Sequence, residues 1–233
     1  MSDSVSIAMA EQREYYEARA SEYDEWWLRK GRYDRGAAEN QAWFDDIATL
    51  ETALSAFEPR GRILELAGGT GLWSEKLLPY AQELTVVDGS PESLRRNRAR
   101  LGSAAVRYIE GDLFAWRPER RFDVVFFSFW LSHVPDTLFR QFWQLVESCL
   151  SPGGRVFFVD SVRQQASTSV DQSVPSSGDV MARTLNDGRS FHVFKIYYDP
   201  AALERQLGEL GWRANVRQTS RYFIVGTAER VTG

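Results

Sequence analysis

The sequence predicts an α/β fold, a doubly wound and largely parallel sheet with helices on both faces. The first observation is that strand-like runs of hydrophobic residues, such as Phe122–Ser128, alternate with amphipathic helical segments. Strands that are hydrophobic throughout are typical of parallel sheets covered on both faces. The second is that the last two strand-like runs lie close enough in the chain to pair as an antiparallel hairpin. Right-handed crossovers between the parallel strands then give the doubly wound arrangement.

A helical segment precedes the predicted sheet. Residues 8–28 have a helical pattern in which aromatic and charged side chains are interleaved, and the stretch KGRYDRG interrupts it. A second helix is expected over Ala37–Phe57, because its apolar residues recur at helical spacing and Pro59 and Gly61 follow it. The predicted sheet does not need residues 8–35.

Strands and helices alternate in the middle of the chain. The best-marked helix has Ser90 as its N-cap and Pro91 at its first position, and it stops at Gly102. A later helix has Asp136 as its expected N-cap, and the stretch SPGG, residues 151–154, is expected to close it. The strands are expected at Arg62–Leu66, Glu83–Asp88, Ala105–Glu110, Phe122–Ser128 and Arg155–Ser161, and a further helix at Leu72–Leu78.

The C-terminal part of the chain begins with a polar segment. Residues 163–190 are rich in Ser and Gln, which fits either a second lid or a surface loop. A strand-like run, Phe191–Tyr198, follows, and Asp199 is expected to cap a last helix that begins at Pro200. That helix ends at Gly211, and the closing hairpin joins strands expected at Trp212–Val216 and Tyr222–Thr227.

No linker divides the chain, so residues 1–233 are expected to form one domain. Within it, residues 1–57 are the expected helical cap or lid, and residues 58–161 the expected cofactor-binding core. Residues 162–233 are expected to supply a substrate-side insertion and the C-terminal hairpin. The sequence leaves the oligomeric state open, a homodimer included.

Composition and charge narrow the class of protein. The chain has 43% hydrophobic and 26% charged residues, as a globular domain does. Its longest apolar run, Val124–Leu131, is too short to cross a bilayer, and the N-terminus lacks signal-peptide features, so a cytoplasmic protein that does not bind membranes is expected. A net charge of −4 argues against nucleic acid as a partner. The single Cys149 excludes an intramolecular disulfide and a cysteine-based metal cluster, and no metal site is expected.

A glycine-rich turn and two carboxylates follow successive strands. Gly68, Gly69 and Gly71 let the backbone turn sharply after the first strand and let a ligand approach it closely. Asp88 ends the second strand, where an acid can accept both hydroxyls of an adenosine ribose. Asp112 ends the third strand, within reach of an adenine edge. A tight strand-to-helix connection would explain the glycines alone, but the three strand ends together favour a nucleotide-type ligand.

The same turn argues against a pyrophosphate ligand. Ser74 stands where a dinucleotide fingerprint has its third small residue, and the Gly-Lys-Ser/Thr triplet of a Walker loop is absent.

These stretches resemble the motifs of class I S-adenosylmethionine (SAM)-dependent methyltransferases. ELAGGTG, residues 65–71, is similar to motif I of that family, VVDGSPESL to motif II and IEGDLFAW to motif III. FDVVFFSFWLSHVPD is similar to motif IV, and LSPGGRVFFVDS to the strand-five motif. The resemblance covers residues 61–161 and implies a Rossmann-like, seven-stranded sheet whose last strand is antiparallel. Ala67 stands where many members have the first glycine, a variation that the family tolerates.

The resemblance also implies roles for individual residues in binding SAM or its product S-adenosylhomocysteine (SAH). Glu65 would order the glycine loop through backbone N–H groups, and residues 67–71 would line the methionine part of the cofactor. The other implied contacts are Asp88 to the ribose with Gly89 beside it, Asp112 and Leu113 to the adenine, and Ser128 or Phe129 to the sulfonium end.

Few side chains are candidates for the reaction itself. His133 lies in the loop after the fourth strand and is the first choice for a general base or a hydrogen bond to the acceptor, the alternative being a packed histidine. His192 is a weaker candidate. Tyr16 and Tyr23 are seven residues apart and would share a helix face, from which Tyr16 could reach the reacting atom and Tyr23 the cofactor. The resemblance to small-molecule methyltransferases implies that residues 8–35 fold over the cofactor and close the pocket, which Trp26 or Trp27 could wall. Core packing is the alternative for all these aromatic residues.

The resulting prediction is an enzyme that transfers a methyl group from SAM to an O, N or S atom of a small molecule. Two rival functions remain at this point. One is a methyltransferase of RNA or protein, which the acidic charge balance disfavours. The other is a catalytically silent module that binds the cofactor and acts through a partner.

Overall fold

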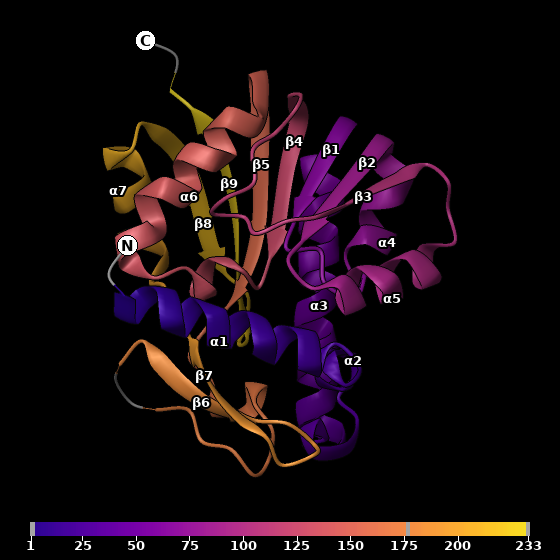
Figure 1. Ribbon diagram of the computed structural model, residues 1–233, viewed down its shortest axis with the longest axis vertical. Coiled ribbons are helices and arrows are strands. Elements are labelled where there is room, and N and C mark those ends of the chain that lie inside the picture. Colours follow the sequence, from indigo (N-terminus) through magenta and orange to yellow (C-terminus); the bar gives the residue numbers. More distant parts are fainter. Residues whose placement is uncertain (1–2, 176–177, 232–233) are drawn as a thin grey trace.

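A seven-stranded sheet forms the centre of the computed structural model, which describes residues 3–175 and 178–231 (Figure 1). The strand order is β3-β2-β1-β4-β5-β9-β8. The first five strands are parallel, whereas β9 is antiparallel to β5 and β8 to β9. The predicted fold class is therefore confirmed. The strands are β1 (Gly61–Leu66), β2 (Ala81–Asp88), β3 (Val106–Glu110), β4 (Phe122–Ser128), β5 (Leu150–Ser161), β8 (Trp212–Gln218) and β9 (Phe223–Arg230).

Both faces of the sheet are apolar, which explains the continuous hydrophobic runs. Neighbouring residues of a strand point to opposite faces. Phe126 of β4 stacks on Phe157 of β5 on one face, with ring centroids 5.9 Å apart. Phe127 stacks on Phe158 on the other, at 5.4 Å. Because all four rings are buried, each face of the sheet needs its own layer of helices.

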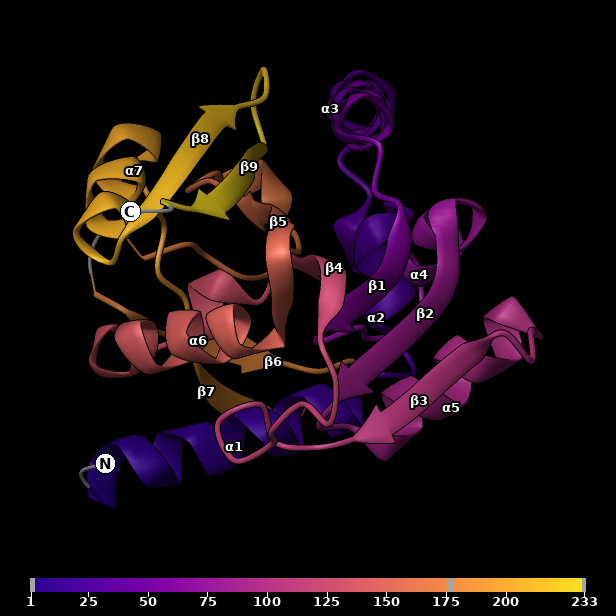
Figure 2. The ribbon, with the colours of Figure 1, turned by 90° about the horizontal axis from the view of Figure 1, so that it is seen from above.

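Helices cover the two faces of the sheet (Figure 2). On the Phe126 face, the core includes Leu50 and Leu94, which belong to α3 (Ala37–Phe57) and α5 (Pro91–Leu101). On the Phe127 face, it includes Trp143 of α6 and Leu207 of α7. The bounds expected for α3 and α5 are confirmed. The remaining helices of these layers are α4 (Ser74–Leu77), shorter than expected, α6 (Asp136–Cys149) and α7 (Pro200–Glu209).

Two of the three predicted N-caps are observed. The Ser90 hydroxyl accepts a hydrogen bond from the backbone N–H of Ser93, and the Asp199 carboxylate accepts one from Ala202. Asp136 instead is the first helical residue of α6, after Pro135. The expected loop at residues 151–154 is also wrong, because Leu150 pairs with Phe122 and β5 therefore begins directly after α6.

The N-terminal segment contains two helices rather than the single predicted one. The first, α1, spans Asp3–Arg19, and after a turn the second, α2, spans Tyr23–Trp27. The turn lets α2 bury Trp26 and Trp27 in the core around Trp43, so tertiary packing overrides the local helical pattern. Tyr16 and Tyr23 therefore lie on different helices, and the expectation that they share one helix face is wrong.

Helix α1 lies between the sheet and a separate hairpin (Figure 1). That hairpin pairs β6 (Val180–Thr184) with β7 (Ser190–Phe194) in antiparallel register. The segment expected to be a lid or loop thus contains a strand of its own, and residues 176–177 of it lie outside the described part. Within the described ranges, no helix is long and apolar enough to span a bilayer.

Candidate active site

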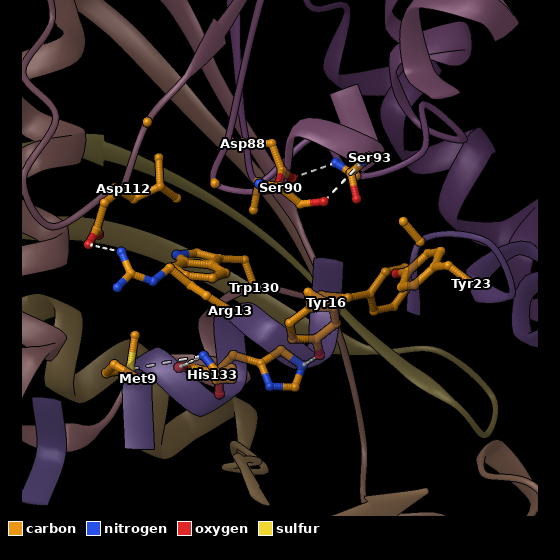
Figure 3. Close-up of a pocket in the computed structure, with 18 of the residues that line it drawn as sticks. Met9, Arg13, Tyr16, Tyr23, Asp88, Ser90, Ser93, Asp112, Trp130 and His133 are labelled. Carbon is orange, nitrogen blue, oxygen red and sulfur yellow. Dashed lines mark hydrogen bonds and ion pairs between the residues drawn. The ribbon is translucent and has the colours of Figure 1, made fainter. Parts of the chain in front are cut away.

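A cavity of about 220 Å³ lies at the carboxyl ends of the parallel strands, where α1 crosses them (Figure 3). We call it the larger cavity. Its walls come from the turns after β1, β2, β3 and β4 and from the N-terminal helices. Ligands of doubly wound sheets bind at this edge. The predicted site residues on its wall are Tyr16, Tyr23, Ala67, Gly69, Asp88, Gly89, Asp112, Leu113, Ser128, Phe129 and His133.

Two of the predicted glycines, Gly68 and Gly71, do not line the cavity, because they face the side of the loop that packs on the protein. A Cβ atom on Gly68 would come within 2.3 Å of Val86, and one on Gly71 within 2.8 Å of Asn97. These glycines therefore let the loop pack closely on the neighbouring strand and helix. At Gly69, by contrast, φ is +53° and a Cβ would meet no atom within 4 Å. Of the three glycines, only Gly69 borders the larger cavity.

The Asp88 carboxylate joins two turns at the floor of the larger cavity. It accepts hydrogen bonds from the backbone N–H groups of Gly69 and Ser90, both at 2.8 Å. Burial raises the pKa of this carboxyl, although the two N–H groups oppose the shift. Each carboxylate oxygen has a second lone pair. Asp88 can therefore still accept the two hydroxyls of a ribose, as the sequence predicts for SAM.

Asp112 faces the larger cavity from the end of β3, where α1 contacts it. Its carboxylate accepts a hydrogen bond from the backbone N–H of Phe114 and forms an ion pair with Arg13 at 2.9 Å (Figure 3). Both charged side chains are more than one-third exposed, so this pair adds little stability. Arg13 and Trp130 also line the larger cavity, although neither belongs to the predicted site residues. The buried indole N–H of Trp130 has no partner within the described ranges.

Tyr16 and His133 form a hydrogen-bonded pair at the inner end of the larger cavity (Figure 3). His133 Nδ1 lies 2.5 Å from the carbonyl oxygen of Phe194, which can only accept, so Nδ1 carries the proton. His133 Nε2 then accepts a hydrogen bond from the Tyr16 hydroxyl at 2.7 Å. Burial, with a smaller effect of the Lys195 charge, lowers the pKa of His133 well below its usual value. The imidazole is therefore neutral and the phenol protonated at neutral pH.

A smaller cavity, of about 50 Å³, adjoins this pair. It shares Tyr16, Tyr23, Phe129 and His133 with the larger cavity. Its other walls come from α1, α2 and residues 161–197. The two cavities therefore meet at Tyr16, Phe129 and His133, the side chains that the sequence predicts near the transferred methyl group.

Of Trp26, Trp27 and His192, only Trp26 lines one of the two cavities. Trp26 lines the smaller cavity, and its indole N–H donates to the Ser167 carbonyl oxygen at 2.7 Å. Trp27 lines neither cavity and packs in the core, which is the alternative that the sequence left open. His192 is exposed beside Glu11 at 3.2 Å, on the wall of neither cavity, so the structure does not support a substrate contact for it.

Glu65 is buried behind the glycine loop and does not bind the backbone as expected. One carboxylate oxygen accepts a hydrogen bond from the Ser74 hydroxyl, and the other has no partner among the described residues. The loop N–H of Gly69 is bound by Asp88 instead. Burial raises the pKa of Glu65 to about 8, so the buried carboxyl is mostly protonated at neutral pH.

We expect Glu65 to make the free energy of unfolding depend on pH. Between its ordinary pKa of 4.5 and about 8, the folded protein holds a proton that unfolding releases, so stability falls as pH rises. Glu65→Gln removes this dependence. Its stability relative to the wild type should rise by on the order of 3 kcal/mol between about pH 5 and pH 8. Urea unfolding of both proteins at the two pH values measures the difference.

Glu75→Gln on the exposed side of α4 is the control, and its difference from the wild type should not change over this range. Parallel pH profiles for the wild type and Glu65→Gln would contradict the expectation.

Comparisons with known proteins agree with this site. Residues 63–154 match the family model described as "Methyltransferase domain". The chain is 27% identical over 226 residues to the ubiquinone biosynthesis O-methyltransferase of Xanthomonas axonopodis pv. citri, covering 83% of this chain and 90% of that protein. It is 30% identical over 102 residues to nodulation protein S of Rhizobium tropici, where the match spans only 43% of each chain.

Solved structures of DhpI resemble the whole chain. The DhpI–SAH complex superimposes with a TM-score of 0.78 at 36% sequence identity, covering 97% of this chain and 98% of DhpI. The DhpI–SAM–HEP complex has the same TM-score at 38% identity. Such identity over nearly the full length of both chains accompanies the sheet order, the glycine loop and the carboxylates at the strand ends. The chain therefore belongs to the class I S-adenosylmethionine-dependent methyltransferases.

Proposed function

We propose that this protein transfers the methyl group of SAM to an O, N or S atom of a small-molecule acceptor. The observation that carries the proposal is the junction of the two cavities at Tyr16 and His133. The larger cavity has the strand ends that fit SAM, and the smaller one offers a separate place for an acceptor. A volume of about 50 Å³ and a net charge of −4 favour a small molecule over RNA or protein.

Different residues of the larger cavity would contact different parts of the cofactor. SAM supplies a methyl carbon that is activated by a positively charged sulfur. Asp88 would bind the ribose hydroxyls, while Asp112, Leu113 and Trp130 would surround the adenine. Ser128 and Phe129, at the end of β4, would border the reacting methyl. The resemblance to the methyltransferase motifs implies these roles, except that of Trp130, and the position of all these residues on one cavity wall supports them.

Tyr16 and His133 would accept a proton when the acceptor atom carries one. The Tyr16 hydroxyl donates its hydrogen to His133, which leaves its oxygen free to accept a hydrogen bond. As the bond from the methyl carbon to sulfur breaks and the bond to the acceptor forms, the acceptor proton would pass to Tyr16 and the phenolic proton to His133 Nε2. An acceptor that is already deprotonated would need Tyr16 only for positioning.

We expect His133→Gln to lower the single-turnover rate on a hydroxyl acceptor about 100-fold or more, with SAH affinity unchanged. Tyr16→Phe should have a similar effect, and the double variant should lose little more, because the pair acts as one unit. The low pKa of His133 keeps its base form at acidic pH, so the wild-type rate should stay level through pH ~6.5, where ordinary histidines titrate. Rapid-quench measurements of methyl transfer report these rates.

A structural role would give another pattern. If His133→Gln and Tyr16→Phe weakened SAH binding and lowered the unfolding midpoint as much as the rate, or if the losses in rate were additive, the proton relay would be wrong.

The proposed activity itself is tested by formation of SAH from SAM with panels of phenols, alcohols, amines, thiols and carboxylic acids. We expect at least one panel to give turnover, and SAH to bind the protein in calorimetry. Asp88→Asn should weaken SAH binding by about tenfold or more, because a charged acceptor of two hydroxyl groups is lost.

Glu110→Gln is the matched control. Glu110 is paired with Asp88 across β2 and β3 but is exposed and lies outside the larger cavity, so its loss should leave SAH affinity unchanged. Equal effects of the two variants, or absence of SAH binding, would overturn the proposed function.

We further propose that α1 is the mobile part of the N-terminal cap. Val5 and Met9 pack against the core, but the contacts farther along the helix are polar: Arg13 with Asp112, Glu17 with Ser90, and Gln12 with the His133 carbonyl oxygen. Helix α2, in contrast, is anchored by two buried tryptophans. The division of the chain into a cap, a core and a substrate-side insertion is proposed on this basis.

SAH should slow amide hydrogen exchange in residues 5–19, because a filled cavity gives α1 more surface to contact. Residues 37–57 of α3 are the internal control and should exchange slowly with or without SAH. If α1 exchanges as slowly as α3 in the absence of SAH, it is part of the static core and the lid proposal fails.

A further inference from the structure

The smaller cavity has an unusual set of charges. Its wall contains three basic side chains, Arg19, Arg183 and Lys195, and no carboxylate from the described ranges. The cavity also has four tyrosine residues besides Tyr16, so hydrogen-bonding groups surround the basic ones. None of the three basic side chains lines the larger cavity. The positive charge therefore belongs to the acceptor side of the site.

Among the described residues, only one of these charges has a carboxylate partner. The Lys195 ammonium group is paired with Asp160 at 3.5 Å and donates to the Ser132 hydroxyl at 2.8 Å. Asp160 is itself buried and accepts a hydrogen bond from the backbone N–H of Ser132. The Lys195 charge is thus neutralised inside the fold, and it helps to position the turn that contains His133.

The two guanidinium groups have neutral partners only. Arg19 lies over the rings of Tyr15 and Tyr23, at 5.5 and 4.9 Å from their centroids. Arg183 donates to the Thr168 hydroxyl at 2.5 Å and to the Gln172 amide oxygen at 3.3 Å. Across residues 3–175 and 178–231, no carboxylate lies within 4.0 Å of either one. Charges that are withdrawn from water without a counter-charge are costly, so their presence here needs a compensating group.

A bound anion would supply that group. The planar fork of an arginine matches the two oxygens of a carboxylate, phosphate or phosphonate, and it is always charged. One water needs ~10–15 Å³, so a volume of about 50 Å³ accommodates a head group of a few atoms. Arg19 on α1 and Arg183 on β6 approach this space from two separate elements.

We infer that the acceptor is a small acid whose oxyanion head is held between Arg19 and Arg183 in the smaller cavity. The inference rests on the proposed function and adds the chemical class of the acceptor. The head group would anchor the molecule so that its reacting atom meets Tyr16 and His133, which line both cavities. The shared chemistry is the oxyanion; the experiment separates a carboxylate from a phosphorus oxyanion.

The test measures binding of three small probes to SAH-saturated protein by ligand-observed NMR titration. Propionate and propionamide have nearly the same shape but differ in charge, and ethylphosphonate presents a tetrahedral oxyanion. We expect at least one anion to bind and propionamide not to bind. Whichever of the two anions binds more tightly shows whether the site prefers a carboxylate or a phosphorus oxyanion.

Charge-removing variants locate the probe. Arg183→Gln and Arg19→Gln should each weaken binding of the anion by about tenfold or more, because a charged hydrogen-bond partner is lost. Their SAH affinity should be unchanged, since neither side chain lines the larger cavity. Arg189→Gln is the control: Arg189 is an exposed arginine at the β6–β7 hairpin, paired with Asp187, and its removal should change nothing. The two variants lie on different elements, so a folding defect in one leaves the other as a test.

The outcomes separate this inference from the proposed function. If SAH binds but propionamide binds as well as the anions, or if both arginine variants bind anions like the wild type, the acid acceptor is wrong and the methyltransferase proposal stands. If SAH does not bind and the protein alone shows the arginine-dependent anion binding, the methyltransferase proposal fails and the anion cavity stands.

Discussion

The Asp88 carboxylate is the interaction on which the shape of the larger cavity depends. It holds the backbone N–H of Gly69 from the turn after β1 and that of Ser90 from the turn after β2. Two separate strand-to-helix turns are thus fixed to one charged group at the edge of the sheet. Since the parallel strands place both turns at the same edge, this one side chain sets the distance between the glycine loop and the start of α5.

The second structural requirement is that α1 is held over this edge of the sheet, although apolar contacts do not extend along its full length. Its inner side makes polar contacts, and Glu17 accepts hydrogen bonds from the Ser90 hydroxyl and the Glu92 N–H. On the other side Tyr15 is buried against Leu185 and Val193 of the β6–β7 region. The hairpin therefore adds apolar support to that of Val5 and Met9, which pack against the core, and α1 and the hairpin both contribute to the wall of the smaller cavity.

The sheet and the cofactor side of the site were predictable because their information is local. Each strand is a continuous apolar run, and Asp88, Asp112 and the glycine turn stand directly after such runs. Caps such as Ser90 and Asp199 act within one helical turn, so their sequence patterns were sufficient.

The acceptor side was less predictable because its residues have no pattern in common. Arg19 lies on α1, Arg183 on β6 and Lys195 directly after β7, so their proximity depends on how α1 packs against the hairpin. The same cause explains the error over residues 8–28. Their helical pattern is real, but burial of Trp26 and Trp27 requires the chain to turn after Arg19, and no local signal marks that turn.

Apart from the N-terminal helices, which line both, the two cavities take their walls from different segments of the chain. The strand ends that form the larger cavity are part of the hydrogen-bonded sheet, where a substitution disturbs the whole fold. Most of the smaller cavity comes from the N-terminal helices and residues 161–197, which the parallel sheet does not contain. Under the proposed function, acceptor specificity can therefore diverge during evolution, or be redesigned, by changing the part within residues 161–197, which lines only the smaller cavity, while the cofactor-binding scaffold is inherited intact.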